Sequence, residues 1–331
     1  MNILRFNQIA IISSIFLLAV ILTAGFYSVN RSHPFNVNFI NAAMYQRTPT
    51  PDGSNQTVHP SIVYFPGAWN GWRYWLAITP YPNGNNKYEN PSILVGNDSA
   101  IKVNGGWQTP AGLKNPIVSH PPGGNYADPE LIYNNDTDEL WLYYCDGPAL
   151  TLQRSSDGVH WTQPRLVLSW SGKTATGMSY SVVKQGHDWY MWYMRGKSIY
   201  RVEYRRSSDG LNWSSARNVT FTPEAQPWHL DVKYIPSMNE YWMFFCASES
   251  DMDSQFQGGS LYFAKSVDRV NWVTMEKPIL TINPLGWDNE RIYRSTFDYD
   301  SSSGIVHLWY SARSLDRGWH IGYATSKLYS K

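Results

Sequence analysis

Acidic, basic and imidazole side chains recur in this chain at the starts of five similar apolar segments. The starts read HPS, DPE, SYS, HLD and RST, and their first positions hold His59, Asp128, Ser179, His229 and Arg294. Two residues later come Ser61, Glu130, Ser181, Asp231 and Thr296. Because residues i and i+2 of a strand face the same side, both sets should converge if the five segments surround a common axis. Converging carboxyl groups can divide into a proton donor and a base.

Six residues are candidates for such acid–base chemistry: Asp128, Glu130, Asp231, Glu224, Glu89 and His59. Asp128 or Glu130 would stabilise developing charge or tune the acid. The acid itself would come from the PEAQPWHLD segment, which supplies the fourth start. Glu89, in the loop KYENPS, or His59 would help as the base.

Five further residues are candidates for binding a ligand: His229, Arg294, Ser179, Tyr180 and Trp228. Arg294 would hold a hydroxyl or carboxylate of the ligand. Two histidines in the ring do not by themselves make a metal site, and no spacing such as HExxH is present. The sequence therefore establishes no metal site and no other cofactor.

A repeat predicts the elements that position these residues. Each start opens an apolar segment, an aromatic segment follows it, and a turn such as RSSDGVHW follows three of the pairs. Trp107, Trp161, Trp213 and Trp272 recur at intervals of about 50 residues, the range of propeller blades. We expect an all-β fold, a five-bladed β-propeller with four strands per blade, whose first strands line the axis. The recurring tryptophans should pack between neighbouring blades.

The chain divides into three parts. Residues 1–30 contain the apolar stretch Ile9–Tyr27, which can just span a bilayer as a hydrophobic helix. It is expected to be a signal anchor or a signal peptide, so the protein would be membrane-anchored with an extracytoplasmic domain, or secreted. Residues 31–58 form a polar stalk or closing segment, and residues 59–331 form the propeller. Five N-x-S/T sequons are compatible with an exported glycoprotein.

Composition limits the partners. The formal net charge is +1 and no basic stripe is present, which argues against nucleic acid. The 16 Trp and 23 Tyr suit a β core, and flat aromatic rings also suit the apolar faces of sugars. Cys145 and Cys246 occupy equivalent repeat positions two blades apart, so they should lie too far apart for a disulfide.

The segment ADPELIYNNDTDELWLYY resembles the five-bladed glycosidase superfamily, glycoside hydrolase families 43 and 32. The resemblance covers about residues 59–327. It also allows a metal ion at the axis, because some members of family 43 hold one there with a His. It implies that either Asp128 or Glu130, depending on the alignment, stabilises the transition state or tunes the acid. Those families begin the first blade with an Asp before Pro, whereas this chain has His59 there. Three alternatives follow: His59 takes the role of base, another carboxyl group such as Glu89 substitutes for the Asp, or the site is not hydrolytic.

The resemblance implies a glycoside hydrolase that acts on extracellular oligosaccharide or polysaccharide by carboxylate catalysis. Hydrolysis needs two carboxyl groups on either side of the bond. A non-catalytic surface propeller that binds glycans is the alternative, and the missing Asp favours it. A phosphorolytic relative is a third possibility, in which Arg294 with Arg195 or His229 would bind phosphate. Fold alone does not decide among them.

Overall fold

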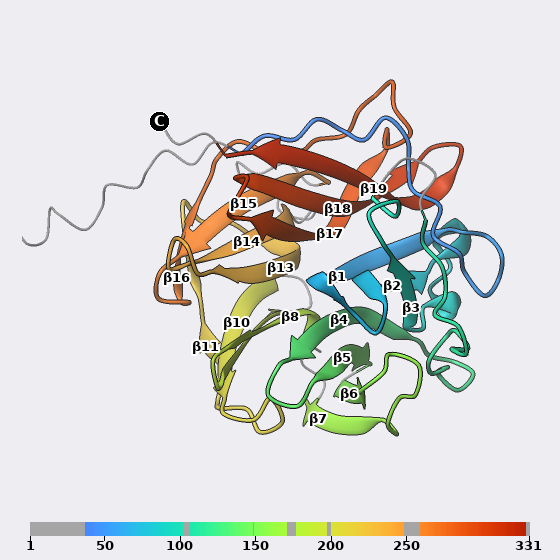
Figure 1. Cartoon of the computed structure of the whole chain (residues 1–331). Helices are drawn as coiled ribbons and strands as arrows, with labels where there is room; N and C mark the ends of the chain where they lie inside the picture. The colour runs from blue at the N-terminus through green and yellow to red at the C-terminus, as the bar shows by residue number, and fades with distance from the viewer. Residues whose placement is uncertain are drawn as a thin grey trace, which may run out of the picture. The chain divides into compact units, whose positions relative to one another are not determined.

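The computed structural model describes residues 37–101, 106–147, 149–170, 177–196, 200–247 and 259–328. In these ranges the chain forms five mainly antiparallel sheets, which surround a common axis as the blades of a propeller (Figure 1). The predicted all-β, five-bladed fold is confirmed. The described residues contain two 3₁₀ turns, η1 (Pro82–Gly84) and η2 (Asn86–Tyr88), and no α-helix.

The first strand of each blade lies nearest the axis (Figure 1). The first strands are β1 (Thr57–Trp69), β4 (Tyr126–Asn134), β8 (Gly177–Gln185), β13 (Pro227–Ile235) and β17 (Arg291–Asp300). The second strands are β2 (Trp72–Pro80), β5 (Glu139–Asp146), β9 (Asp188–Gly196), β14 (Glu240–Ala247) and β18 (Ile305–Ser314). The third strands are β3 (Ser92–Gly96), β6 (Ala149–Ser155), β10 (Tyr200–Ser207), β15 (Leu261–Ser266) and β19 (Gly318–Lys327).

Only the middle blades have the predicted fourth strand in the described ranges. These outer strands are β7 (Arg165–Ser169), β11 (Arg217–Asn218) and β16 (Asn271–Thr274). The short strand β12 (Thr220–Thr222) leaves blade three and pairs in parallel with β16 of blade four. In blades one and five, single bridges extend the sheets instead, from Val95 to Gln108 and from Gln46 to Ile321.

The bridge at Gln46 joins the two ends of the described chain. The Gln46 amide donates to the Ile321 carbonyl of blade five at 2.7 Å. Its side chain reaches blade one, where it accepts from Trp107 Nε1 and donates to the Ala100 carbonyl, both at 2.9 Å. Gln46 is buried. A residue of the segment 31–58 therefore links the first blade to the last.

The predicted hydrophobic helix within residues 1–30 lies outside the described residues, and the membrane anchor stays a prediction. Among the residues that the structure does describe, no helix has the length and apolar character needed to cross a bilayer.

The recurring tryptophans pack between blades, as predicted. Trp107 joins the cluster of blades five and one, and Trp161 joins that of blades one and two. Trp213 and Trp272 fill the next two seams. Cys145 and Cys246 are buried, and no disulfide joins them, also as predicted.

The SSDG turns position these tryptophans. Asp157 Oδ1 accepts the backbone amides of Val159 and His160, each at 2.8 Å, which holds the turn in shape. Gly158 has φ +75°, a conformation that glycine adopts at little cost. A Cβ on Gly158 would lie 2.0 Å from the Trp75 ring of the preceding blade, so glycine is also required for the close approach.

A closed cycle of hydrogen bonds links the five first strands at the axis. Each i+2 side chain of the aligned starts accepts a backbone N–H from the first strand of the next blade, at 2.9–3.3 Å. The five donor–acceptor pairs are Leu131 to Ser61, Val182 to Glu130, Val232 to Ser181, Phe297 to Asp231 and Ile62 to Thr296. We call these five acceptor side chains the lower ring.

Ser61→Ala tests this cycle. Ser61 Oγ accepts the Leu131 amide and donates to Glu130 Oε2, and all of these groups are buried. Leaving buried partners unpaired should lower the free energy of unfolding by about 1–3 kcal/mol, measured by urea denaturation. Ser156→Ala, at an exposed position, is the control. Equal free energies of unfolding for the two variants would contradict the claim that the hydrogen bonds of the lower ring stabilise the fold.

Candidate active site at the propeller axis

A β-bulge or similar irregularity interrupts every first strand near its aligned start. The register with the second strand shifts between Val58 and Ser61, and blades two and three shift at the equivalent residues. In blades four and five the shift begins one residue earlier relative to the aligned start. Within the bulges His59, Asp128 and Ser179 have φ of +51° to +56°, which is uncommon for non-glycine residues. Bulges re-aim side chains and are common beside active sites. Here they accompany the convergence of the start residues on the axis.

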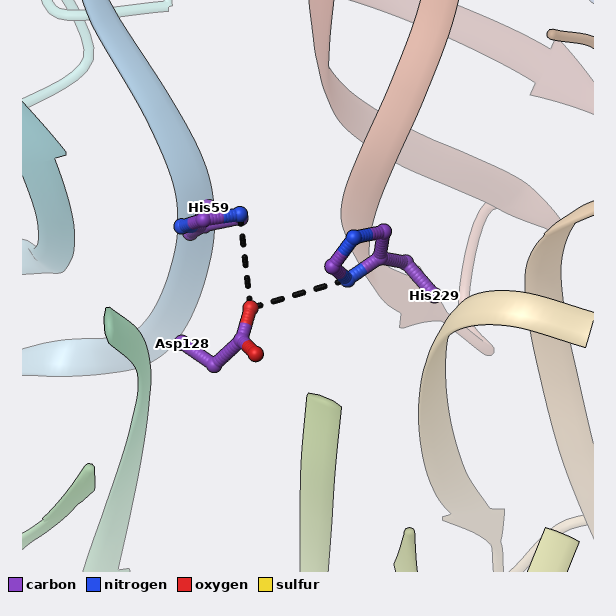
Figure 2. A group of neighbouring side chains, drawn as sticks. All are labelled: His59, Asp128 and His229. Carbon is purple, nitrogen blue, oxygen red and sulfur yellow. Dashed lines mark ion pairs between the residues drawn. The ribbon is translucent and has the colours of Figure 1, made fainter. Parts of the chain in front are cut away.

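Three of these start residues form a compact cluster, which we call the upper cluster: His59, Asp128 and His229. One ligand-type atom from each lies within 4.8 Å of the others. Both imidazoles approach the same carboxylate oxygen of Asp128, His59 through Nε2 at 3.3 Å and His229 through Nδ1 at 3.5 Å (Figure 2). All three residues are about 4% exposed. Each comes from a different blade, β1, β4 or β13.

The two imidazoles are held in their neutral form. Burial lowers the pKa of His59 to about 4 and that of His229 to about 3, although the charge of Asp128 opposes both shifts. Both ring nitrogens of His229 are buried and have no hydrogen-bond partner in the described part of the chain. His59 differs, because its Nδ1 lies 3.0 Å from Thr79 Oγ1.

Asp128 is held as a carboxylate. Burial opposes ionisation, but the imidazoles, Arg294 and the Ser179 amide outweigh it and lower the pKa of Asp128 below its usual range. The Ser179 amide donates to Asp128 Oδ2 at 2.9 Å, and Arg294 Nη1 donates to Oδ1 at 3.3 Å.

Glu89 completes the site from the loop that follows β2. Its Oε1 lies 3.5 Å from His59 Nδ1, and its Oε2 accepts a hydrogen bond from Asn125 at 2.6 Å. Burial and the charge of Asp128 raise the pKa of Glu89 to about 8, although the bond from Asn125 opposes this shift. Glu89 and Asp128 thus differ in protonation at neutral pH, which is the division expected of an acid–base pair.

Arg294 lies between the upper cluster and the lower ring. Besides Asp128, it donates to Glu130 Oε2 at 3.1 Å and to the Tyr180 carbonyl at 3.2 Å. The residue is only 1% exposed. Its guanidinium therefore contacts two buried carboxyl groups of this chain and orients Asp128. Burial and the charge of Asp231 raise the pKa of Glu130, although Arg294 opposes the shift.

The chain is similar to proteins of known activity and structure. No family model matches the chain. A curated protein from Flavonifractor plautii, "A type blood N-acetyl-alpha-D-galactosamine deacetylase", is 31% identical over 324 residues. The match covers 79% of this chain, and the chain spans about 40% of the length of that relative.

Solved structures agree on the architecture. An N-acetylgalactosamine deacetylase from F. plautii, in complex with blood group B trisaccharide, superposes with a TM-score of 0.74 and 27% identity, over 88% of this chain and 95% of that chain. A GH62 α-L-arabinofuranosidase from Coprinopsis cinerea gives 0.62 and 14%, over 88% and 97%. The chain has the five-bladed propeller fold of the glycoside hydrolases. The predicted resemblance to this superfamily is confirmed.

Within this propeller, the predicted catalytic residues fall into three environments. His59, Glu89 and Asp128 meet at the upper cluster. Glu130 and Asp231 belong to the lower ring, where they are 0% and 1% exposed. Glu224 is exposed in the segment between β12 and β13 and makes no hydrogen bond or ion pair with the other candidates in the described residues.

The predicted ligand-binding residues also separate. His229 belongs to the upper cluster, and Trp228 packs against its edge with ring centroids 5.6 Å apart. Ser179 binds Asp128 through its amide, and its hydroxyl accepts the Leu230 amide at 3.1 Å. Tyr180 is fully buried against Trp170 and Tyr193 and does not face the cluster.

Sequence reasoning missed two contributors. Tyr293 packs edge-on against His229 with centroids 4.3 Å apart and lies 5.5 Å from the His59 ring. Asn125 holds Glu89. Tyr293 directly precedes the aligned Arg294 in the sequence, and this adjacency is the signal that could have found it. Arg195, the predicted phosphate ligand, instead pairs with Glu203 at 3.2 Å.

Arg294→Met tests the buried ion pairs. Removing the guanidinium leaves Asp128 and Glu130 without their cation, so the free energy of unfolding should fall by about 3–5 kcal/mol. Urea denaturation measures this loss. Arg73→Met removes an ion pair with Asp98 that is largely in solvent and should cost no more than about 1 kcal/mol. A similar loss in both variants would show that Arg294 does not carry this role.

Proposed function

We propose that this chain hydrolyses the N-acetyl group of a hexosamine in a glycan, with a divalent metal ion held by the upper cluster. The sequence similarity to the F. plautii deacetylase and the cluster itself support this proposal. The single observation that carries it is His229, whose two buried ring nitrogens have no hydrogen-bond partner among the described residues, although Nδ1 lies 3.5 Å from Asp128. With the predicted anchor, the propeller would meet such glycans outside the cytoplasm.

The donor set fits a metal ion. Buried polar atoms without partners are costly, and coordination by His229 would remove that cost. Neutral imidazole and ionised carboxylate are the forms that bind metals, and both forms are present here. Two imidazoles and one carboxylate suit zinc and other first-row divalent ions. Bound there, such an ion would polarise the amide carbonyl and lower the pKa of water.

Glu89 is the residue placed for proton transfer. Hydrolysis forms a bond between a water oxygen and the carbonyl carbon, breaks the C–N bond and adds a proton to the amine nitrogen. Glu89 would take the proton from water and return it to the nitrogen. With a pKa of about 8, both of its forms are accessible near neutral pH. The Asn125 amide holds this carboxyl group in place.

Glycoside hydrolysis is the second candidate, and the geometry favours it less. Such hydrolysis needs two carboxyl groups on either side of the bond. Of the predicted carboxyl groups, Asp128 belongs to the upper cluster and Glu89 lies beside it. Both contact His59, Asp128 at Nε2 and Glu89 at Nδ1. Glu130 and Asp231 instead accept the hydrogen bonds that close the lower ring. A propeller that only binds glycans is the remaining alternative.

Chelation and His229→Ala test the proposed deacetylase. The full chain should release acetate from oligosaccharides that end in N-acetylgalactosamine, lose this activity after dialysis against a chelator, and recover it with zinc or manganese. His229→Ala should bind less metal and release acetate about 100-fold more slowly or worse. His187→Ala, at an exposed histidine, is the control. Acetate release that survives both treatments would refute the metal centre.

The same oligosaccharides distinguish the rival functions. Release of reducing sugar without acetate would identify a glycosidase, and Asp128→Asn and Glu130→Gln would then show which carboxyl group it needs. Binding without either product would indicate a glycan-binding propeller.

Glu89→Gln separates proton transfer from metal binding. The variant should keep its metal content but lose about 10²–10⁴-fold in kcat, because general acid–base catalysis contributes on that order. Metal content and kcat are measured on the same preparation. Glu276→Gln, at an exposed position, should match the unaltered protein. A Glu89→Gln enzyme with normal kcat would exclude this role.

A further inference from the structure

A cavity opens at the end of the propeller axis that lies away from the upper cluster. It has a volume of about 460 Å³ and is lined by the trailing ends of the five first strands, β1, β4, β8, β13 and β17. The upper cluster lies at the leading ends of these strands, so the two sites are separate. The volume is within the range of small-ligand pockets.

The axial positions of this cavity divide into an apolar and a charged side. Four residues after the aligned starts, blades one to three place Val63, Ile132 and Val183. Blades four and five place Lys233 and Asp298 at the same level. Charged groups in such half-buried positions cost free energy unless they are paired. Lys233 is paired with Asp231 of the lower ring, and both charged residues also line the cavity.

Lys233 and Asp298 offer a donor and an acceptor from neighbouring blades in the lining of one cavity. Lys233 Nζ lies 3.7 Å from Asp231 Oδ1 of the lower ring, and its side chain remains 25% exposed. Asp298 is half-buried, and burial raises its pKa although Lys233 opposes the shift. An ammonium beside a carboxylate can bind neighbouring hydroxyl groups, and the near balance of charge favours a neutral ligand.

Tyrosines line the cavity one residue further along the strands. Tyr64, Tyr133, Tyr234 and Tyr299 occupy this level in four blades, each with a half-buried ring. Their rings pack on other aromatic rings, as Tyr64 does on Tyr74 and Tyr299 on Trp242. The tyrosines therefore complete the wall of the cavity, and the apolar and charged axial positions supply the contacts to a ligand.

We propose that this cavity binds one neutral sugar residue, such as the end of a glycan chain. The hydroxyl groups lie toward Lys233 and Asp298, and the apolar face of the ring lies against the aliphatic side. This site does not depend on the proposed deacetylation, because it shares no residue with the upper cluster.

Ligand binding to the full chain tests the proposal. The probes are the methyl glycosides of glucose, galactose, mannose, N-acetylglucosamine and N-acetylgalactosamine, followed by saturation-transfer NMR titration. At least one should bind saturably. Asp298→Asn should raise its Kd roughly tenfold, because a bond to a charged group is lost. Val63→Phe should fill the cavity and abolish binding, and neither variant should change acetate release.

Two controls locate the binding. Asp300→Asn makes the same change two residues away, where the carboxylate binds Ser302 and Ser303 of its own turn, and should leave Kd unchanged. His229→Ala should also leave it unchanged. Thermal unfolding checks that Val63→Phe folds, and Asp298→Asn alone decides if it does not. Absence of saturable binding, or binding lost only in His229→Ala, would overturn the proposal.

Discussion

The structure depends on how five first strands satisfy their backbone at the axis. The inner edge of each blade has no further strand to pair with, yet its amides are buried, and buried amides need partners. The lower ring supplies them, one side chain per blade. Glu130 and Asp231 therefore have a structural role as hydrogen-bond acceptors. Arg294 contacts both Glu130 and Asp128 and reduces the electrostatic cost of burying them close together. Because Arg294 binds both Glu130 of the lower ring and Asp128, the closure of the ring also fixes the position of Asp128 in the upper cluster.

Much of this arrangement could be predicted from the repeat. Aligning the five starts correctly placed His59, Asp128 and His229 at one end of the axis and assigned the recurring tryptophans to the seams. The alignment could not show at which level along the axis each side chain lies. Asp128 and Glu130 look equivalent in a strand of period two, but the bulge between them separates a residue at the cluster from one in the lower ring.

Other residues depended on contacts between distant segments. Tyr180 is among the residues expected at the site, whereas the strand turns its ring into the core of blades two and three. Glu89 could be found as a carboxyl group in the loop KYENPS, but its raised pKa arises from burial beside Asp128, which no local pattern reports. Glu224 is acidic and close in sequence to His229, and that proximity carries no information about side-chain direction.

Gln46 has a consequence for the order in which the molecule forms. It contacts both the first blade and the last, so the ring is sealed by residues far apart in the chain, and contacts of this kind carry the largest loop-closure entropy. Seams between consecutive blades can form as the chain is made, whereas this one must wait for blade five. Until then the flanks of blades one and five are exposed, and such unpaired edges are where β proteins associate wrongly. The seam at Gln46 is therefore the seam at which wrong association of β edges during synthesis and folding is most expected.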